Sequence, residues 1–378
     1  MARIYLDATP VLQGERAVRR NTTNLYRHLL LESGAEEYVF PYFTGRSGGR
    51  LQLEGGVKTI PIRWPGRLLQ PLWLRLGWPC IEDLAGHCDL YYSPDLIFPP
   101  GRRARVLSTV RGVAYYEVPQ YFSVNALSWM LTMHAYALRH STHWLAVSES
   151  TRLVLLERDK LDPDHVFVVS HGVDPMFRHL DRAEARAQVQ ARFGVQRPYL
   201  LYVGVVALHK NIAGLLQMLS HLRQAHPDLH LVLVGPNGTA TEEVDAALAS
   251  PLLATRVRRL GAVATDDPIL AALYNASEAL VHLSHYEGWC APPLEAMACG
   301  IPVVLSDLPS LREVGGEAAS YAPLNEPDQA AEIVTRLLED SSYREAKIRA
   351  GLKVAAAHSW IHAARKFASV LRRVLNDA

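Results

Sequence analysis

Three features that would narrow the function of this sequence are missing from it. No window approaches ~20 uninterrupted apolar residues, the length that a helix needs to span a bilayer. The first residues, MARIYLDATPVL, carry no long apolar stretch of the kind found in signal peptides. The formal net charge is only +1, which gives no strong electrostatic case for binding nucleic acid. We therefore expect a cytoplasmic chain without a nucleic-acid partner.

Cysteine is also scarce, with only four in 378 residues. Cys80, Cys88, Cys290 and Cys299 form no C-x-x-C pair and have no zinc-like spacing with histidine. The sequence therefore predicts reduced, mostly buried thiols. A D-x-D pattern at 162–164 contains Pro163 and precedes an expected strand, so we interpret it as a turn and predict no bound metal.

The sequence does have a regular alternation of short apolar runs with longer helical patterns. Such alternation is typical of βαβ units with parallel sheets, and 378 residues favour two domains of roughly 100–200 residues each. Strands are expected at 3–6, 38–43, 90–93, 106–110, 144–147 and 166–169, and again at 199–203, 229–234, 257–260, 279–283, 302–305 and 319–321. The sequence thus predicts an α/β protein with two open parallel sheets in tandem, each of about six strands.

A change of composition at 172–197 separates the two halves. There HGVDPMF is followed by a charged helical pattern and then by GVQRP. We place the two domains at 1–180 and 181–359. A last helical pattern follows Trp360, and by its periodicity alone it can pack on either domain.

Ligands of open parallel sheets bind beyond the carboxyl ends of the strands, and the second half offers three such ends with suitable residues. In LLYVGVVALHKN, Gly204 ends a strand and a loop then carries His209, Lys210 and Asn211 to the start of a helix. A lysine beside a helix N-terminus suits a phosphate, although a solvated loop with a stray lysine is the alternative. In LVLVGPNG, Gly235 allows a similar close approach of a ligand to the backbone.

A third strand end, in HYEGWCAPPLEAMACGIPVV, carries two carboxylates. Glu287 lies in the loop and Glu295, eight positions later, lies in the first turns of the next helix. Both can face one cleft, and the backbone N–H groups from Gly288 to Ala291 can form an anion-binding rim beside them. A helix with a merely acidic first turn is the alternative interpretation.

This segment resembles the E-x7-E signature of the retaining glycosyltransferases of family 4, and in particular bacterial mannosyltransferases of polysaccharide biosynthesis. The resemblance extends over roughly residues 1–375 and is most specific at 256–322; YVGVVALHKN, SHGVD and LPSLREVGGEAASYA fit the same family. It implies the GT-B fold, in which two Rossmann-like, doubly wound parallel-sheet domains face a central cleft. The first domain binds the acceptor, the second binds the nucleotide-sugar, and the last helix, 360–378, crosses back to the first.

The resemblance also implies roles for individual residues. Lys210 and His209 bind the donor diphosphate, Glu287 contacts the transferred sugar and acts in catalysis with Lys210, and Glu295 holds the ribose. The implied donor-binding set is Gly204, His209, Lys210, Asn211, Gly235, Ala262, Val263, Gly288, Trp289, Cys290, Ala291, Leu294 and Glu295. No metal and no cofactor other than the donor are implied.

The first half departs from the family pattern. Its loop GERAVRRNT lacks the usual glycines, and Arg111-Gly112 stands where the family often has a His-Asp pair. We take Arg111 as a third catalytic candidate, one that can contact a charged sugar or acceptor. In the signature loop, Trp289-Cys290-Ala291 replaces the commoner Phe-Gly-Leu, and we expect Trp289 to pack.

We therefore predict retaining transfer of a hexose to a glycan or lipid-linked glycan, with GDP-mannose favoured over UDP-sugars as the donor. The alternative is a non-catalytic relative that binds a nucleotide-sugar or a protein partner. A nicotinamide enzyme is disfavoured, because no G-x-G-x-x-G follows the first strand. The segment 63–79 mixes arginine with tryptophan and leucine; it can touch a membrane surface peripherally, or pack on the core or on a second subunit of a homodimer.

Overall fold

The computed structural model describes residues 2–14, 16–32, 34, 36–44, 51, 56–64 and 66–377. By its internal contacts the chain divides into two compact units, Met1–Gly172 with Trp360–Ala378, and Val173–Ser359. The sequence puts the boundary at 180, but residues 173–180 group with the second unit. The reason is physical, because Phe177 lies in the core of that unit and the backbone N–H of Leu180 donates to Asn275 at 2.8 Å.

The first unit is built on one parallel sheet. Within the described ranges it has seven strands in the order β3-β2-β1-β4-β5-β6-β7. They are β1 (Arg3–Leu6), β2 (Glu37–Phe43), β3 (Lys58–Ile62), β4 (Leu90–Ser93), β5 (Arg105–Val110), β6 (His143–Ala146) and β7 (Val166–Val168). The strand order reverses between β1 and β4, which makes this edge a place where loops separate and can receive a ligand.

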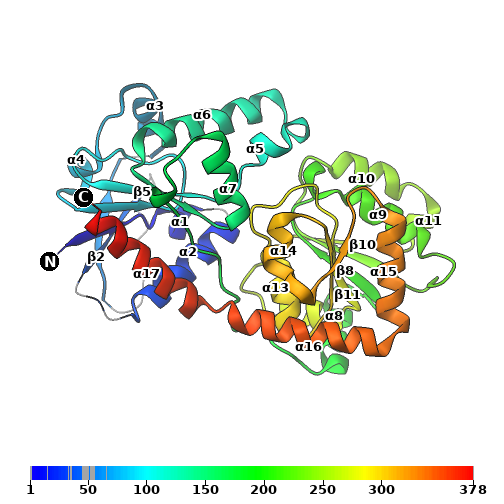
Figure 1. Ribbon diagram of the computed structural model, residues 1–378. Coiled ribbons are helices and arrows are strands. Elements are labelled where there is room, and N and C mark those ends of the chain that lie inside the picture. The colour runs from blue at the N-terminus through cyan, green and yellow to red at the C-terminus, as the bar shows by residue number, and fades with distance from the viewer. Residues whose placement is uncertain are drawn as a thin grey trace. The chain divides into compact units, whose positions relative to one another are not determined.

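Helices connect and cover these strands. They are α1 (Thr9–Gln13), α2 (Arg16–Leu29), α3 (Gly66–Leu76), α4 (Ile81–Ala85), α5 (Ala114–Glu117), α6 (Val124–His140) and α7 (Glu149–Arg158), with 3-10 turns η1 (Pro119–Tyr121) and η2 (Pro163–His165) (Figure 1). The sequence predicts a helix at 149–159 with Ser148 as its cap, and Ser148 does cap α7 by accepting from the backbone N–H of Thr151. The D-x-D pattern is a turn, since Asp162 accepts from the backbone N–H of Asp164 at 2.9 Å.

The last helix, α17 (Trp360–Asn376), also packs on the first unit. Its buried residues recur at spacings of three and four, so one side of the helix is apolar. Phe367 from that side meets Tyr92 of β4 edge to face, with 4.7 Å between ring centroids. The same core takes in Tyr26 and Leu29 of α2, the helix beside α17 in Figure 1.

The second unit has a sheet of the same kind. In the part of the chain that the structure describes, it has six parallel strands in the order β10-β9-β8-β11-β12-β13. They are β8 (Tyr199–Val203), β9 (His230–Val234), β10 (Val257–Gly261), β11 (Ala279–His282), β12 (Val303–Ser306) and β13 (Ser320–Ala322). The order reverses between β8 and β11, so the loops after these two neighbouring strands diverge at one edge.

Helices lie on both faces of the second sheet. They are α8 (Arg182–Phe193), α9 (Ile212–His221), α10 (Thr241–Leu248), α11 (Pro251–Ala254), α12 (Ile269–Ala276), α13 (Ala291–Ala298), α14 (Pro309–Gly315), α15 (Pro327–Glu339) and α16 (Ser341–Ala357), with short turns η3 (Leu208–Lys210) and η4 (Gly316–Ala318). Two separate apolar clusters, one on each face, hold them to the strands. The fold class predicted from the sequence, α/β with two parallel sheets, is confirmed.

Several elements differ from the sequence-based expectation, the short helices α1, α4 and α5 among them, and three are instructive. Strand β3 was not expected; it is a mostly solvent-facing edge strand that contains Pro61, so its apolar pattern is weak. The apolar pattern predicts a helix from Asn21 to Glu32, whereas helix α2 begins five residues earlier, at Arg16. Helix α16 was also missed, because most of it is exposed and its apolar periodicity is correspondingly weak.

The segment 63–79 divides its apolar side chains between core and solvent. In α3, Leu69 and Trp73 are buried, whereas Leu68 is 65% exposed and Leu76 is 69% exposed. Trp64 and Trp78, at the two ends of the segment, are also exposed. Among the described residues, no helix combines the length and the apolar character that crossing a bilayer requires.

Phe367→Ala is expected to lower the free energy of unfolding of the first unit by about 3–5 kcal/mol, because it leaves a cavity between α17 and the sheet. Ile361→Ala, at an exposed position on the same helix, is the matched control and should change the free energy by about 0.5 kcal/mol or less. Urea unfolding of the three proteins measures the difference. Equal effects of both substitutions would contradict the packing of α17 on this sheet.

Candidate active site

The reversal of strand order in the second sheet brings together two loops that the sequence singles out. The loop after β8 forms η3 and carries Lys210, and the loop after β11 carries Glu287. Because β8 and β11 are hydrogen-bonded neighbours, residues 77 positions apart meet at one sheet edge.

Asn211 braces these two loops. It adopts a left-handed backbone conformation (φ 52°) and caps α9 by accepting from the backbone N–H of Gly214 at 3.0 Å. Its side-chain amide donates to the carbonyl of Leu283, in the loop after β11, at 2.9 Å. A backbone bond from His285 to His209 adds a second link. The predicted donor ligand Asn211 is thus engaged in holding the loop that presents Lys210.

Lys210 and Glu287 form a direct ion pair. The Nζ of Lys210 donates to Oε2 of Glu287 at 2.6 Å, and the two side chains are 17% and 6% exposed. The other carboxylate oxygen of Glu287 accepts from Ser284 at 2.8 Å, and Ser310 donates to the backbone carbonyl of Glu287 at 2.6 Å. Glu287 is therefore fixed by groups from three segments, whereas Lys210 retains some access to solvent.

Burial and the Lys210 charge set the protonation states at this edge. Burial alone would raise the pKa of Glu287, but the charge and hydrogen bonds of Lys210 and Ser284 outweigh it and hold the pKa below the ordinary 4.5. Burial, and then the Lys210 charge, lower the pKa of His209 to about 4. His209 is thus neutral at pH 7 and can donate a hydrogen bond, while Lys210 supplies the positive charge.

Two further groups behind Glu287 belong to the same cluster. His282, the last residue of β11, stacks on Tyr202 of β8 at 4.7 Å, and burial lowers its pKa to about 4. Cys290 lies 3.7 Å from the His282 ring, and burial raises the pKa of its thiol, so the sulfur keeps its proton. The sequence reasoning missed His282, Ser284 and Ser310; only the pairing of β11 with β8 could have indicated the first.

Glu295 lies deeper than Glu287. It sits inside α13, is 3% exposed, and accepts from the hydroxyl of Tyr274 in α12 at 2.6 Å. Leu294, beside Glu295, and Cys290, at the N-cap of α13, both belong to the apolar core. Ala291 is the first residue of α13, and Gly288 is buried in the loop before it. Trp289 packs on the same core beside His358, at 5.9 Å between ring centroids.

Glycines bring the backbones of three strand ends close together. A Cβ on Gly235 (φ 150°) would stand 1.8 Å from the carbonyl oxygen of Gly204, so no other residue fits this position. The N–H of Gly235 in turn donates to the carbonyl of Gly261 at 2.8 Å. An opening of about 230 Å³ lies beside these strand ends, lined by Val206, Leu233, Gly235, Asn237, Arg259 and Gly261. Ala262 is exposed and Val263 half-buried in the loop that follows.

Arg111 belongs to the first unit, at the carboxyl end of β5, and donates to the carbonyl of Pro94 at 2.5 Å. The structure thus does not bring it together with Lys210 and Glu287 within one unit.

Asp7, at the end of β1, is a candidate that the sequence reasoning missed. It is 7% exposed, accepts from Thr9 and Tyr91, and burial raises its pKa to about 6. A buried carboxyl with a raised pKa at the reversal point of a sheet is typical of a functional position.

The sequence of this chain is similar to those of known glycosyltransferases. Residues 184–354 match the sequence model of the family described as Glycosyl transferases group 1. O-antigen chain mannosyltransferase B of Escherichia coli is 29% identical over 298 residues, which is 78% of this chain and 75% of that protein. The serotype-specific mannosyltransferase WbdA of Escherichia coli is 28% identical over 239 residues, which is 62% of this chain and 29% of that longer protein.

Solved structures of similar fold cover nearly the whole chain. Sucrose-phosphate synthase from Thermosynechococcus elongatus has a TM-score of 0.76 at 19% identity, with 99% of each chain covered. Anabaena HepE in complex with UDP-glucose has a TM-score of 0.73 at 17% identity, with 98% of this chain and 99% of that chain covered. At these identities the likeness shows the fold, which is that of GT-B glycosyltransferases.

Glu287→Gln is expected to lower the free energy of unfolding at pH 7 by about 1.5–3 kcal/mol, the range for a hydrogen bond to a charged group. Because the pKa of Glu287 is held below 4.5, its ionised form stabilises the fold above that pH, and the stabilisation is lost as the pH falls. The difference between wild type and variant should therefore stay constant from pH 7 to about pH 5 and shrink as the pH falls below 4.5, as measured by urea unfolding. Glu345→Gln, in an exposed pair with Arg349, is the control. A difference that stays constant with pH would contradict the assignment.

Proposed function

With residues 184–354 forming a glycosyl transferases group 1 domain, we propose that the chain transfers a hexose, mannose, from GDP-mannose to a glycan or lipid-linked glycan with retention of the anomeric configuration. The observation that carries this proposal is the Lys210–Glu287 pair at the reversal point of the second sheet. One cation and one carboxylate at that edge are what a sugar joined to a diphosphate requires.

The chemistry assigns a separate task to each member of the pair. As the bond from sugar to phosphate breaks, negative charge develops on the β-phosphate, and a preorganised cation stabilises that charge. Lys210, with the N-terminus of α9 behind it, supplies the cation and the helix dipole. Glu287, oriented by its hydrogen bond from Ser284, accepts hydrogen bonds from the sugar hydroxyls once the diphosphate has drawn Lys210 away. Glu295 is proposed to hold the ribose hydroxyls, with Tyr274 as the group that orients it.

The opening beside β9 and β10 supports guanine as the base. Arg259 lines it, with one guanidinium nitrogen 2.6 Å from Asn237 and another bonded to Asp245. Guanine presents two adjacent acceptors, O6 and N7, which would replace Asn237 and Asp245 as the partners of the paired arginine donors. Backbone atoms of Gly261, Ala262 and Val263 complete the proposed base site. The named mannosyl activity of the two Escherichia coli relatives favours mannose as the sugar, while the UDP-glucose bound by HepE keeps UDP-sugars as the competing donors.

The acceptor is assigned to the first unit, on the edge that carries Arg111 and Asp7. Arg111 adds a positive charge there, which suits a charged sugar or acceptor. The exposed apolar side chains Leu68 and Leu76, with Arg75 on the same helix α3, suit a peripheral contact with a lipid-linked acceptor at a membrane surface.

A second candidate function is a non-catalytic protein that binds the nucleotide-sugar or a partner. Arg111-Gly112, in place of the His-Asp pair, favours it. Calorimetry would then show binding of GDP-mannose without release of GDP across a panel of glycan and lipid-linked acceptors. Release of GDP with formation of a glycoside would exclude this candidate.

Lys210→Met is expected to reduce the rate of mannosyl transfer from GDP-mannose about 10²–10³-fold, the cost of losing one transition-state donor. The assay follows GDP release and the anomeric proton of the product, which should be that of an α-mannoside. Lys353→Met, at an exposed position of α16, should keep the wild-type rate. An unchanged rate in Lys210→Met, or a β-linked product, would contradict the proposed mechanism.

Arg259→Met is expected to weaken GDP binding by about 1–3 kcal/mol and to leave UDP binding nearly unchanged, since only guanine offers the two acceptors. Titration calorimetry with GDP and UDP measures the discrimination. Arg258→Met, on the exposed neighbour in β10, is the matched control. Equal losses for both nucleotides would remove Arg259 from base recognition.

A further inference from the structure

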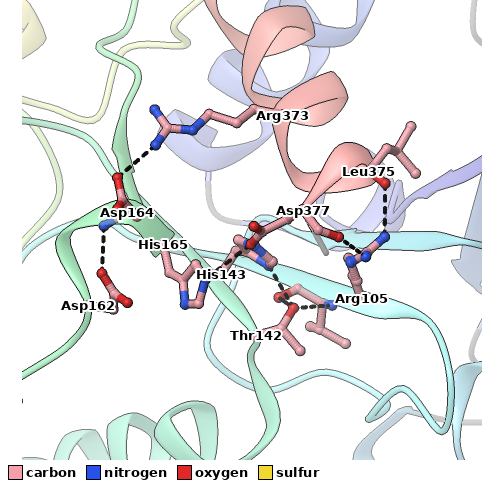
Figure 2. Close-up of polar contacts among 10 residues, drawn as sticks. Arg105, Thr142, His143, Asp162, Asp164, His165, Arg373, Leu375 and Asp377 are labelled. Atoms are coloured by element: carbon pink, nitrogen blue, oxygen red, sulfur yellow. Dashed lines mark hydrogen bonds and ion pairs between the residues drawn. The ribbon is translucent and has the colours of Figure 1, made fainter.

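Three side chains from three segments of the first unit converge at the end of α17. His143 begins β6, His165 ends η2, and Asp377 follows the last helical residue (Figure 2). The Nε2 atoms of His143 and His165 lie 2.7 Å and 3.0 Å from the same carboxylate oxygen, Oδ2 of Asp377. All three candidate ligand atoms lie within 4.8 Å of one another.

Thr142 lies beside the other ring nitrogen of His143. Its hydroxyl is 2.8 Å from Nδ1 of His143 and also meets the backbone of Val106, at 2.9 Å from the N–H nitrogen and 3.1 Å from the carbonyl oxygen. Nε2 of His143 is therefore the nitrogen directed at Asp377, and with the proton on Nδ1 it presents a lone pair there.

The remaining contacts hold the cluster in place without using its ligand atoms. Arg105 donates to the carbonyl of Leu375 at 2.9 Å and also bonds the carbonyl of Asp377, which fixes the backbone around the carboxylate. Arg373 of α17 pairs with Asp164 at 2.9 Å, next to His165. In Figure 2 the two terminal nitrogens of Arg105 are directed at the backbone oxygens of Leu375 and Asp377. Support of this kind around candidate ligands is characteristic of preorganised metal sites.

We propose that His143, His165 and Asp377 bind a divalent transition metal ion, and that Zn²⁺ is the ion whose chemistry the set fits. Two imidazole nitrogens and one carboxylate oxygen are ligands that Zn²⁺ accepts in tetrahedral sites, whereas Mg²⁺ and Ca²⁺ prefer oxygen alone. The side chains of His165 and Asp377 are each 41% exposed, which gives the ion an entry path and leaves room for water as the fourth ligand.

The ion would have a structural role and not a catalytic one. It would join the end of α17 to β6 and to η2, and so fasten the last helix to the sheet that it covers. Metal bound only by the folded state stabilises that state by mass action. This inference rests on the first unit alone and is independent of the proposed donor site.

A second group in the chain has similar spacing, and it is a weaker metal site. His282, Glu287 and Cys290 also place candidate ligand atoms within 4.8 Å of one another. All three are buried, Glu287 is already bonded to Lys210 and Ser284, and burial keeps the thiol protonated. Metal binding there would require the loss of the ion pair and the deprotonation of Cys290.

The test is titration of the chelator-treated full chain with Zn²⁺ by calorimetry and with Co²⁺ by absorption, both near pH 7.5, where unperturbed imidazoles are neutral. We expect one ion per chain, Co²⁺ d–d bands without a thiolate charge-transfer band, and a higher thermal unfolding midpoint with Zn²⁺. His165→Gln and Asp377→Asn should each weaken Zn²⁺ binding by at least about tenfold. His87→Gln, in an exposed pair with Asp89 at 3.5 Å, should leave the affinity unchanged.

Three outcomes would overturn the proposal. They are the absence of binding to the wild-type chain, a thiolate band that places Co²⁺ at Cys290, and equal affinity in wild type, His165→Gln and Asp377→Asn. The two variants change half-exposed side chains, and circular dichroism will show whether they fold. The wild-type titration and the Co²⁺ spectrum decide the question even if a variant does not.

Discussion

The ion pair between Lys210 and Glu287 is the interaction on which the site depends. It joins the loops after two neighbouring strands at the point where the strand order of the second sheet reverses. The loop after β11 could not hold the charge of Glu287 alone, because this carboxylate is buried and an isolated buried charge is costly. Asn211 and the bond between His285 and His209 tie the loops together, so the pair is positioned by the same contacts that join β8 to β11.

The same edge combines rigidity with access. Gly204 and Gly235 let two strand ends approach so closely that a single Cβ would strike backbone at 1.8 Å, which leaves bare peptide groups facing the opening beside Arg259. Lys210 stays partly accessible while Glu287 is enclosed. An anionic ligand that reaches Lys210 exchanges one partner of the lysine for another, while Glu287 keeps its hydrogen bond from Ser284.

Much of this organisation was predictable from the sequence because it rests on local patterns. The strand at 199–203, the cap at Ser148 and the turn at Asp162 follow from apolar runs and from short polar side chains next to them. Lys210 and Glu287 were found because each lies in the loop after an apolar strand pattern. The brace from Asn211 to Leu283 and the bond from Tyr274 to Glu295 were not predictable, since they depend on strand order and helix packing. The cluster of His143 with Asp377 joins residues 234 positions apart and leaves no local signal. Strand β3 was not predicted from the sequence, because an exposed edge strand with a proline lacks the apolar run that marks the other strands.

The central claim is that Lys210 and Glu287 separate around the diphosphate-linked sugar. A crystal structure of the chain with GDP-2-deoxy-2-fluoromannose, a slowly reacting donor, tests it most directly. The account predicts Nζ of Lys210 at about 2.7–3.2 Å from a phosphate oxygen and the Glu287 carboxylate within the same distance of a sugar hydroxyl. A donor bound elsewhere, with Lys210 still paired to Glu287 at 2.6 Å as it is here, would contradict it.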